Sequence, residues 1–185
     1  MATNHGGFES ILDDPDYPGR APGSGDEPLD PGYPRRRTRE DPSDWRRWFQ
    51  LGFQLSEHPV EAAEAYGRAL RLRPDNGLVH RELAFSMLRG GAPRARAIQH
   101  LRAAVALRPA DRPAWNMLGI LAAKAGRVDS ALHAWRKVAA LRPDEETFWS
   151  IGDCLHAKGR HRAAAVALEE AVRLKPNHLP ALLLL

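Results

Sequence analysis

The sequence predicts an all-α fold, an α-solenoid of antiparallel helix pairs preceded by a disordered N-terminal arm. One spacing recurs four times: a small residue, a large residue four positions later, a third residue three further on, and a proline five beyond that. The prolines are Pro74, Pro109, Pro143 and Pro176, which follow one another at intervals of 35, 34 and 33 residues. A period of this length is typical of an array of small structural units rather than of a single globular core.

Each recurrence predicts one helix. Steps of four and three residues align side chains on one helix face, and the proline ends the helix because it lacks a backbone donor. The cation before each proline is favoured by the dipole at the helix C-terminus. The four stripes and their cations are Ala62-Tyr66-Ala69 with Arg73, Ala97-Leu101-Ala104 with Arg108, Ala131-Trp135-Val138 with Arg142, and Ala164-Leu168-Ala171 with Lys175.

A second helix is predicted upstream of each of these. Its signature is a bulky residue, an aliphatic residue three later and a small residue directly after. A glycine inside a helix costs about 1 kcal/mol relative to alanine, so its recurrence predicts a close approach of the neighbouring helix. The instances are Trp48-Leu51-Gly52, His80-Leu83-Ala84, Trp115-Leu118-Gly119 and Phe148-Ile151-Gly152.

These residues resemble the tetratricopeptide repeat (TPR), a family of paired antiparallel helices. The nearest match is the third repeat, through Trp115, Leu118, Gly119, Gly126, Ala131, Trp135 and Pro143. We expect four repeats within residues 43–176, at approximately 43–75, 76–110, 111–144 and 145–177. Residues 178–185 are expected to begin a further, apolar helix. Ser43 and Asn177 are the expected N-caps of the first and last helices.

Residues 1–42 differ from the rest in composition. They contain seven prolines and few large apolar side chains, which predicts a disordered acidic arm with a net charge of −4. The remainder carries +8. The single cysteine, Cys154, fits a reducing compartment. The sequence shows no secretory signal and no apolar run long enough to span a membrane, so we expect a cytoplasmic protein without membrane insertion.

The sequence offers no catalytic constellation, so we expect a protein that is not an enzyme. It has no phosphate-binding glycine loop. Cys154, His156 and His161 lie close together but fit no common zinc spacing. Neighbouring carboxylates, such as Glu145 and Glu146, point apart on a helix. No cofactor and no metal ion is therefore expected.

The resemblance implies that the first helices of successive repeats line a concave groove that binds a protein or peptide. The implied groove positions are Phe49, Phe53, Arg81, Phe85, Asn116, Ile120, Trp149 and Asp153. Members that clamp the carboxylates of heat-shock chaperones place lysine and asparagine where Phe49 and Phe53 stand, so that subclass is not expected. The groove suits an amphipathic helix or an extended apolar segment. A simpler reading is that Phe49 and Phe53 pack under a terminal segment.

We therefore expect a non-catalytic scaffold or adaptor. The alternatives are an interaction module of a longer enzyme, a chaperone of a secretion or assembly machinery and, less favoured, a nucleic-acid-binding protein that uses its many arginines. Acidic segments are among the expected partners, including the chain's own Phe8, Ile11 and Leu12 with the aspartates that follow. The apolar end could lie over the fourth repeat, continue into further chain, or self-associate through Leu182, Leu183, Leu184 and Leu185.

Overall fold

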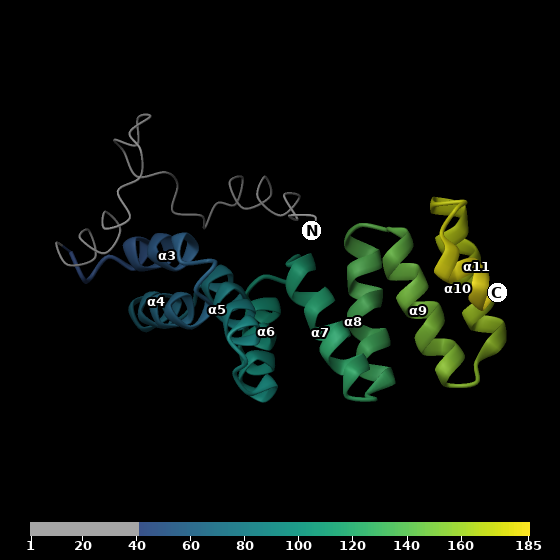
Figure 1. Ribbon diagram of the computed structural model, residues 1–185, viewed down its shortest axis with the longest axis horizontal. Helices are drawn as coiled ribbons and strands as arrows, with labels where there is room; N and C mark the ends of the chain where they lie inside the picture. Colours follow the sequence, from purple (N-terminus) through teal and green to yellow (C-terminus); the bar gives the residue numbers. More distant parts are fainter. Residues whose placement is uncertain (1–40) are drawn as a thin grey trace. The chain divides into compact units, whose positions relative to one another are not determined.

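The computed structural model describes residues 41–185, so the acidic arm predicted for 1–42 lies outside the described residues except for its last two positions (Figure 1). The described chain divides into two compact units. The first ends at Leu107 and the second comprises Arg108–Leu185. All regular structure in the described range is helical, which confirms the predicted all-α class.

The first unit contains two antiparallel helix pairs. They are α3 (Trp45–Gln54) with α4 (Pro59–Leu72), and α5 (Gly77–Arg89) with α6 (Arg94–Leu107). Helices α3, α4 and α5 share one core, in which Phe49 contacts Tyr66 with ring centroids 5.4 Å apart. Both aromatic side chains are buried, so the core of the first pair is built around them.

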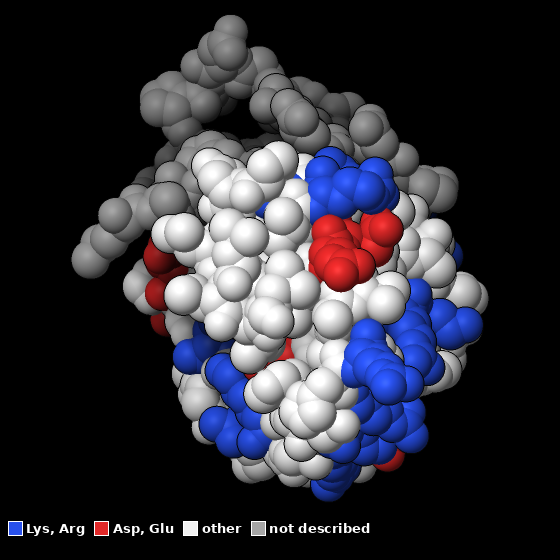
Figure 2. Space-filling model, turned by 90° about the vertical axis from the view of Figure 1, so that its right-hand side faces the viewer, with Lys and Arg blue, Asp and Glu red and all other residues white. Residues whose placement is uncertain are grey.

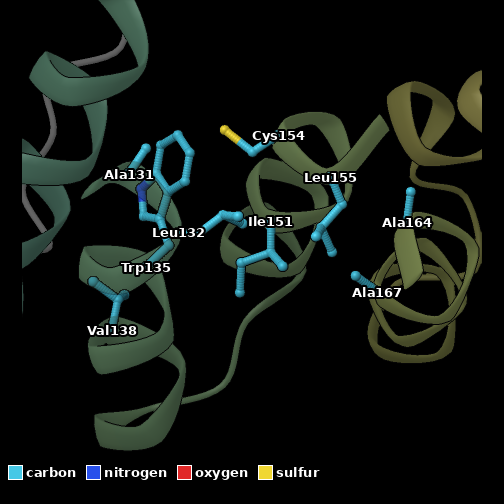
Figure 3. Close-up of a cluster of buried hydrophobic side chains, with 9 residues drawn as sticks. All are labelled: Ala131, Leu132, Trp135, Val138, Ile151, Cys154, Leu155, Ala164 and Ala167. Carbon is cyan, nitrogen blue, oxygen red and sulfur yellow. The ribbon is translucent and has the colours of Figure 1, made fainter. Parts of the chain in front are cut away.

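The second unit repeats this arrangement and adds a short last helix. Its helices are α7 (Arg112–Lys124), α8 (Val128–Leu141), α9 (Glu145–Ala157), α10 (His161–Leu174) and α11 (Leu179–Leu184). One apolar cluster joins α8, α9 and α10 (Figure 3). Leu132 of α8 points toward Ile151 of α9, and Leu155 lies on the side of α9 that faces α10. The recurring apolar positions therefore build a continuous core within the unit.

The recurring glycines of the first helices mark close contacts with the large residue of the second helix. A Cβ atom on Gly119 would lie 2.6 Å from Nε1 of Trp135, and one on Gly52 would lie 2.8 Å from the Tyr66 ring. A Cβ on Gly152 would lie 2.7 Å from the Leu168 side chain. The sequence therefore places glycine where the partner helix leaves no room for a methyl group.

The bulky residue that opens the first-helix signature has a role beyond packing. The indole Nε1 of Trp48 donates to the Pro42 carbonyl at 2.9 Å, and that of Trp115 donates to the Pro109 carbonyl at 2.9 Å. His80 Nε2 lies 3.1 Å from the Pro74 carbonyl in the same relation. At three of the four positions, the bulky side chain thus makes a hydrogen bond to the carbonyl six residues earlier. The fourth, Phe148, has no donor for this bond.

Side chains directly after the proline turns cap the first helices. The side chains of Asn76, Asp111 and Asp144 accept from the backbone amides of Val79, Ala114 and Thr147. The first and last helices differ from the expectation by one residue each. Asp44, and not Ser43, caps α3, and the ring of His178, and not Asn177, caps α11. In each case the helix begins one residue later than expected, so the residue after the expected cap takes the N-cap position.

Replacing Asn76 by alanine should lower the free energy of unfolding by about 1 kcal/mol, because the Val79 amide at the start of α5 loses its acceptor. Asn76 is only 1% exposed, so little water can reach that amide in its place. Asn76→Ser is the matched control, since serine also caps helices and should preserve most of the stability. Urea unfolding followed by circular dichroism measures both changes. Equal stability of the alanine and serine variants would contradict this assignment.

Among residues 41–185, no helix has both the length and the apolar character that crossing a membrane requires.

Candidate partner-binding surfaces

Two of the four groove positions expected in the first unit belong to the packing of that unit. Phe49 is 1% exposed and sits between Trp45 and Tyr66 in the core. Arg81 is 6% exposed, and its guanidinium binds the Glu82 carboxylate through Nε at 2.9 Å and Nη2 at 2.8 Å. A partner could reach neither side chain without disturbing the core or this ion pair. Both side chains therefore serve the packing and the ion pairing of the fold.

The other two positions of the first unit remain accessible. Phe53 of α3 and Phe85 of α5 are half-buried, each one helical turn beyond its buried neighbour. We call the surface of Phe53 and Phe85 the first-helix face of this unit. Aromatic side chains that keep part of the ring at the surface are characteristic anchors in protein interfaces.

In the second unit, Asn116 also serves the fold. Its Oδ1 accepts a hydrogen bond from Nε1 of the buried Trp135 at 3.2 Å. Ile120, one turn later on α7, is half-buried and packs against the same apolar cluster. The amide oxygen of Asn116 thus accepts the hydrogen bond of the Trp135 indole, which can pack this closely because Gly119 has no side chain. The same bond holds the Asn116 side chain in place.

Trp149 and Asp153 of α9 lie one turn apart and are both accessible. Trp149 is half-buried, packs on Leu168 and Ala171, and has its ring centroid 6.3 Å from that of His178. Asp153 is exposed. This pair combines a large aromatic surface with an adjacent negative charge, so it can both bury apolar area and orient a ligand.

Helix α11 buries one side and exposes the other. Ala181 is fully buried against Leu168 and Ala171 of α10, whereas Leu183 is 87% exposed. Figure 2 looks onto this end of the unit and shows a broad area without Lys, Arg, Asp or Glu, bordered by basic residues and, on one side, by a group of acidic ones. The helix therefore covers part of the fourth repeat. Self-association through Leu182, Leu183, Leu184 and Leu185 stays a prediction.

The sulfur and imidazole groups near residue 154 do not form a common site. Cys154 is buried in the core, and burial, followed by the charge of Asp153, raises the pKa of its thiol. His156 and His161 are exposed and pack ring against ring at 5.0 Å. Within residues 41–185, His, Cys, Asp and Glu side chains nowhere gather in threes around a position for a metal ion.

A groove that the sequence reasoning missed lies within the first unit. Its volume is about 780 Å³, and α4, α5 and α6 line it. We call it the α4–α6 groove. The floor includes Leu83 and Met87 of α5, and Val60 at the edge is 60% exposed. The signal in the sequence is a second stripe on α4, in which Val60, Ala63, Gly67 and Arg71 follow one another at helical spacing.

Two imidazoles pair at the edge of this groove. Nδ1 of His80 and Nδ1 of His100 are 3.0 Å apart, and Nε2 of His80 lies against the Pro74 carbonyl. Because a carbonyl can only accept, His80 donates to Pro74 through Nε2, and the two Nδ1 atoms share one proton between the rings. Burial lowers the pKa of His100, and the charges of His80 and Arg96 lower it further. The surroundings of His100 therefore disfavour a charge on its ring.

The first unit should lose stability as the pH falls below about 6.5, the ordinary histidine value. His100 has a lower pKa in the folded state, so the unfolded chain binds the proton first and acid favours unfolding. His80 and Arg96 are the charged or titratable groups that act on it. Denaturant unfolding at a series of pH values measures the effect. His100→Gln should flatten the dependence, and an unchanged slope in that variant would contradict the assignment.

Comparison with known proteins agrees with the helix-pair architecture. A family model of the tetratricopeptide repeat matches residues 94–146 and 116–178. The chain is similar to the crystal structure of MamA at 21% identity and a TM-score of 0.72, over 79% of this chain and 86% of that one. A MamA fragment from Desulfovibrio magneticus RS-1 gives 22% identity and a TM-score of 0.69, over 79% and 84%.

A third solved structure is YrrB, described as a TPR protein with an unusual peptide-binding site. It shares 25% identity with this chain at a TM-score of 0.71, over 82% of this chain and 79% of YrrB. No curated protein sequence matches the chain.

Proposed function

Because this chain belongs to the tetratricopeptide-repeat family, we propose that it is a non-catalytic scaffold or adaptor that binds a peptide or helical segment of another protein. The observation that carries the proposal is the division of the expected groove positions into two groups. Phe49, Arg81 and Asn116 serve packing, ion pairing and hydrogen bonding within the fold. Phe53, Phe85 and Trp149 keep part of an aromatic ring at the surface.

An aromatic ring that keeps part of its surface exposed on a helix is a candidate anchor for a ligand. Burying the remaining surface of such a ring contributes on the order of 1 kcal/mol or more to binding, and aromatic residues are enriched at the centres of interfaces. Arg81, the basic residue among the expected groove positions of this unit, is already paired with Glu82. The ligand that suits the two aromatic rings is therefore apolar, either an amphipathic helix or an extended segment.

The peptide-binding site in the description of YrrB is a property of that protein, and it supports the class of ligand proposed here. Trp149 and Asp153 offer a second, smaller set of contacts in the other unit. There the charge of Asp153 favours a ligand with a basic residue beside its apolar ones.

Selection from a random peptide library against the full chain tests this proposal. The expected result is enrichment of peptides with two or more large apolar side chains at a fixed spacing. A photo-reactive group placed beside those side chains should then cross-link to α3 and α5 or to α9. Failure to enrich any peptide, or cross-links confined to other helices, would count against the proposal.

A further inference from the structure

The α4–α6 groove has the composition of a ligand site, and it is separate from the first-helix face. Its floor is apolar, with Leu83 and Met87 of α5 and Leu70 of α4. Val60 at its edge keeps 60% of its surface exposed, although a β-branched side chain gains from burial. An apolar ligand could therefore bury surface here that the fold of residues 41–185 leaves in water.

The rim of this groove is positively charged. Arg68, Arg71 and Arg96 line it, opposed by the single carboxylate of Glu64. Arg68 stacks on the Trp48 ring at 4.5 Å. Within the described residues, neither Arg71 nor Arg96 has an ion-pair partner, and both are exposed. The guanidinium groups of Arg71 and Arg96 are therefore available to an acidic ligand, whereas Arg81 of α5 is buried and paired with Glu82.

We propose that the α4–α6 groove binds an acidic, apolar segment, and that its occupant is residues 8–16 of the same chain. This segment, which lies outside the described residues, combines Phe8, Ile11 and Leu12 with Asp13, Asp14 and Asp16. Ile11 and Leu12 follow Phe8 by three and four residues. This spacing aligns side chains on one face of a bound helix. The aspartates would meet the arginines of the rim.

The connecting chain is long enough for this contact. Residues 17–40 number 24, and an extended chain spans about 3.3 Å per residue, so the tether could reach up to about 80 Å. The described chain begins beside the C-terminal end of α4, where the Arg73 guanidinium lies 4.9 Å from the Trp45 ring. Helix α4 itself has 14 residues and is about 20 Å long. Every part of the groove on α4 therefore lies within reach.

A tethered segment competes at a high local concentration. For short flexible connections this is on the order of millimolar, so even a weak intramolecular contact is well populated. An acidic ligand from another protein would have to displace residues 8–16 before it could occupy the groove. The segment would then act as a built-in competitor for this surface, while the first-helix face with Phe53 and Phe85 stays available. The inference does not depend on the function proposed for that face.

Paramagnetic relaxation in the full chain tests the contact. The only native cysteine is replaced through Cys154→Ala, and a spin label is attached after Ser10→Cys. The expected result is selective broadening of the amide signals of Gly67, Gly90 and Ala92, which line the groove. The triple change Asp13→Asn, Asp14→Asn and Asp16→Asn should remove most of that broadening. These changes lie outside residues 41–185, so they leave the core of the repeats unaltered.

Reversal of the rim charges is the complementary test. Arg71→Glu with Arg96→Glu should also abolish the broadening, while Arg102→Glu should preserve it, because Arg102 is an exposed arginine of α6 that does not line the groove. Broadening beside Phe53 and Phe85 instead of the groove would overturn the proposal. Uniform weak broadening across the chain would also overturn it. So would broadening that appears only when a spin-labelled chain is mixed with an isotope-labelled chain, because the segment in the groove would then come from a second copy.

Discussion

Gly119→Ala should lower the free energy of unfolding by about 2 kcal/mol, as measured by urea denaturation. The new methyl group would lie 2.6 Å from Trp135 Nε1, so the buried indole would have to shift. Overpacking of this kind costs about 1–3 kcal/mol. The hydrogen bond from Trp135 to Asn116 would be displaced as well, at about 1 kcal/mol. The better helix propensity of alanine offsets about 1 kcal/mol of this cost. The net loss of unfolding free energy is therefore about 2 kcal/mol.

Gly67→Ala provides the matched control. Gly67 also lies inside a helix, but a Cβ there would meet nothing nearer than the Arg71 guanidinium at 3.9 Å. This change should raise stability by about 0.5–1 kcal/mol. In a Trp135→Ala background the cost of Gly119→Ala should shrink, because the indole atoms nearest the new methyl are gone. Two glycine variants with the same sign of effect would contradict this packing account.

Phe53→Ser combined with Phe85→Ser should abolish capture of the ligand, while helical circular dichroism persists. Each ring is half-buried, so the double change removes surface available to a ligand and costs less stability than a change in the core. Leu72→Ser is the control, because Leu72 is an exposed apolar residue of α4 with 44% of its surface accessible. It should leave capture unchanged. A pull-down with an immobilised, library-selected peptide measures all three proteins.

The helix pairs could be predicted from the sequence because packing constrains each of their marker residues. The stripe Ala131, Trp135 and Val138 is buried as expected, and Gly119 lies where the Trp135 ring leaves no space for a side chain. The caps were harder to place. Ser43 and Asp44 are both good capping residues, and only the start of the helix decides between them.

The role of the aromatic opening residues was predicted in part. The pattern of Trp48, His80 and Trp115 indicates a large ring that fills the space between two helices. It does not reveal that each ring carries a nitrogen placed against a proline carbonyl. That bond depends on the path of the turn six residues earlier, which the spacing of side chains on a helix does not describe.

The candidate surfaces were the least predictable feature. The family pattern identifies which positions follow the bulky and the small residue, but it does not say how deep each one lies. Phe49 and Phe53 are equivalent by pattern, yet the first packs against Tyr66 and the second stays half-buried. The α4–α6 groove was missed because its arginines are spread along the sequence and come to one groove only when α4 and α6 both pack against α5.

Calorimetric titration of a library-selected peptide into the full chain tests the central claim, that accessible aromatic residues on the first helices bind a partner segment. We expect saturable binding to the wild-type chain and at least a tenfold weaker affinity for the Phe53→Ser, Phe85→Ser variant, equivalent to about 1.4 kcal/mol. The control Leu72→Ser should bind like the wild type. Equal affinity of the double variant and the wild type, at equal helix content, would contradict the claim.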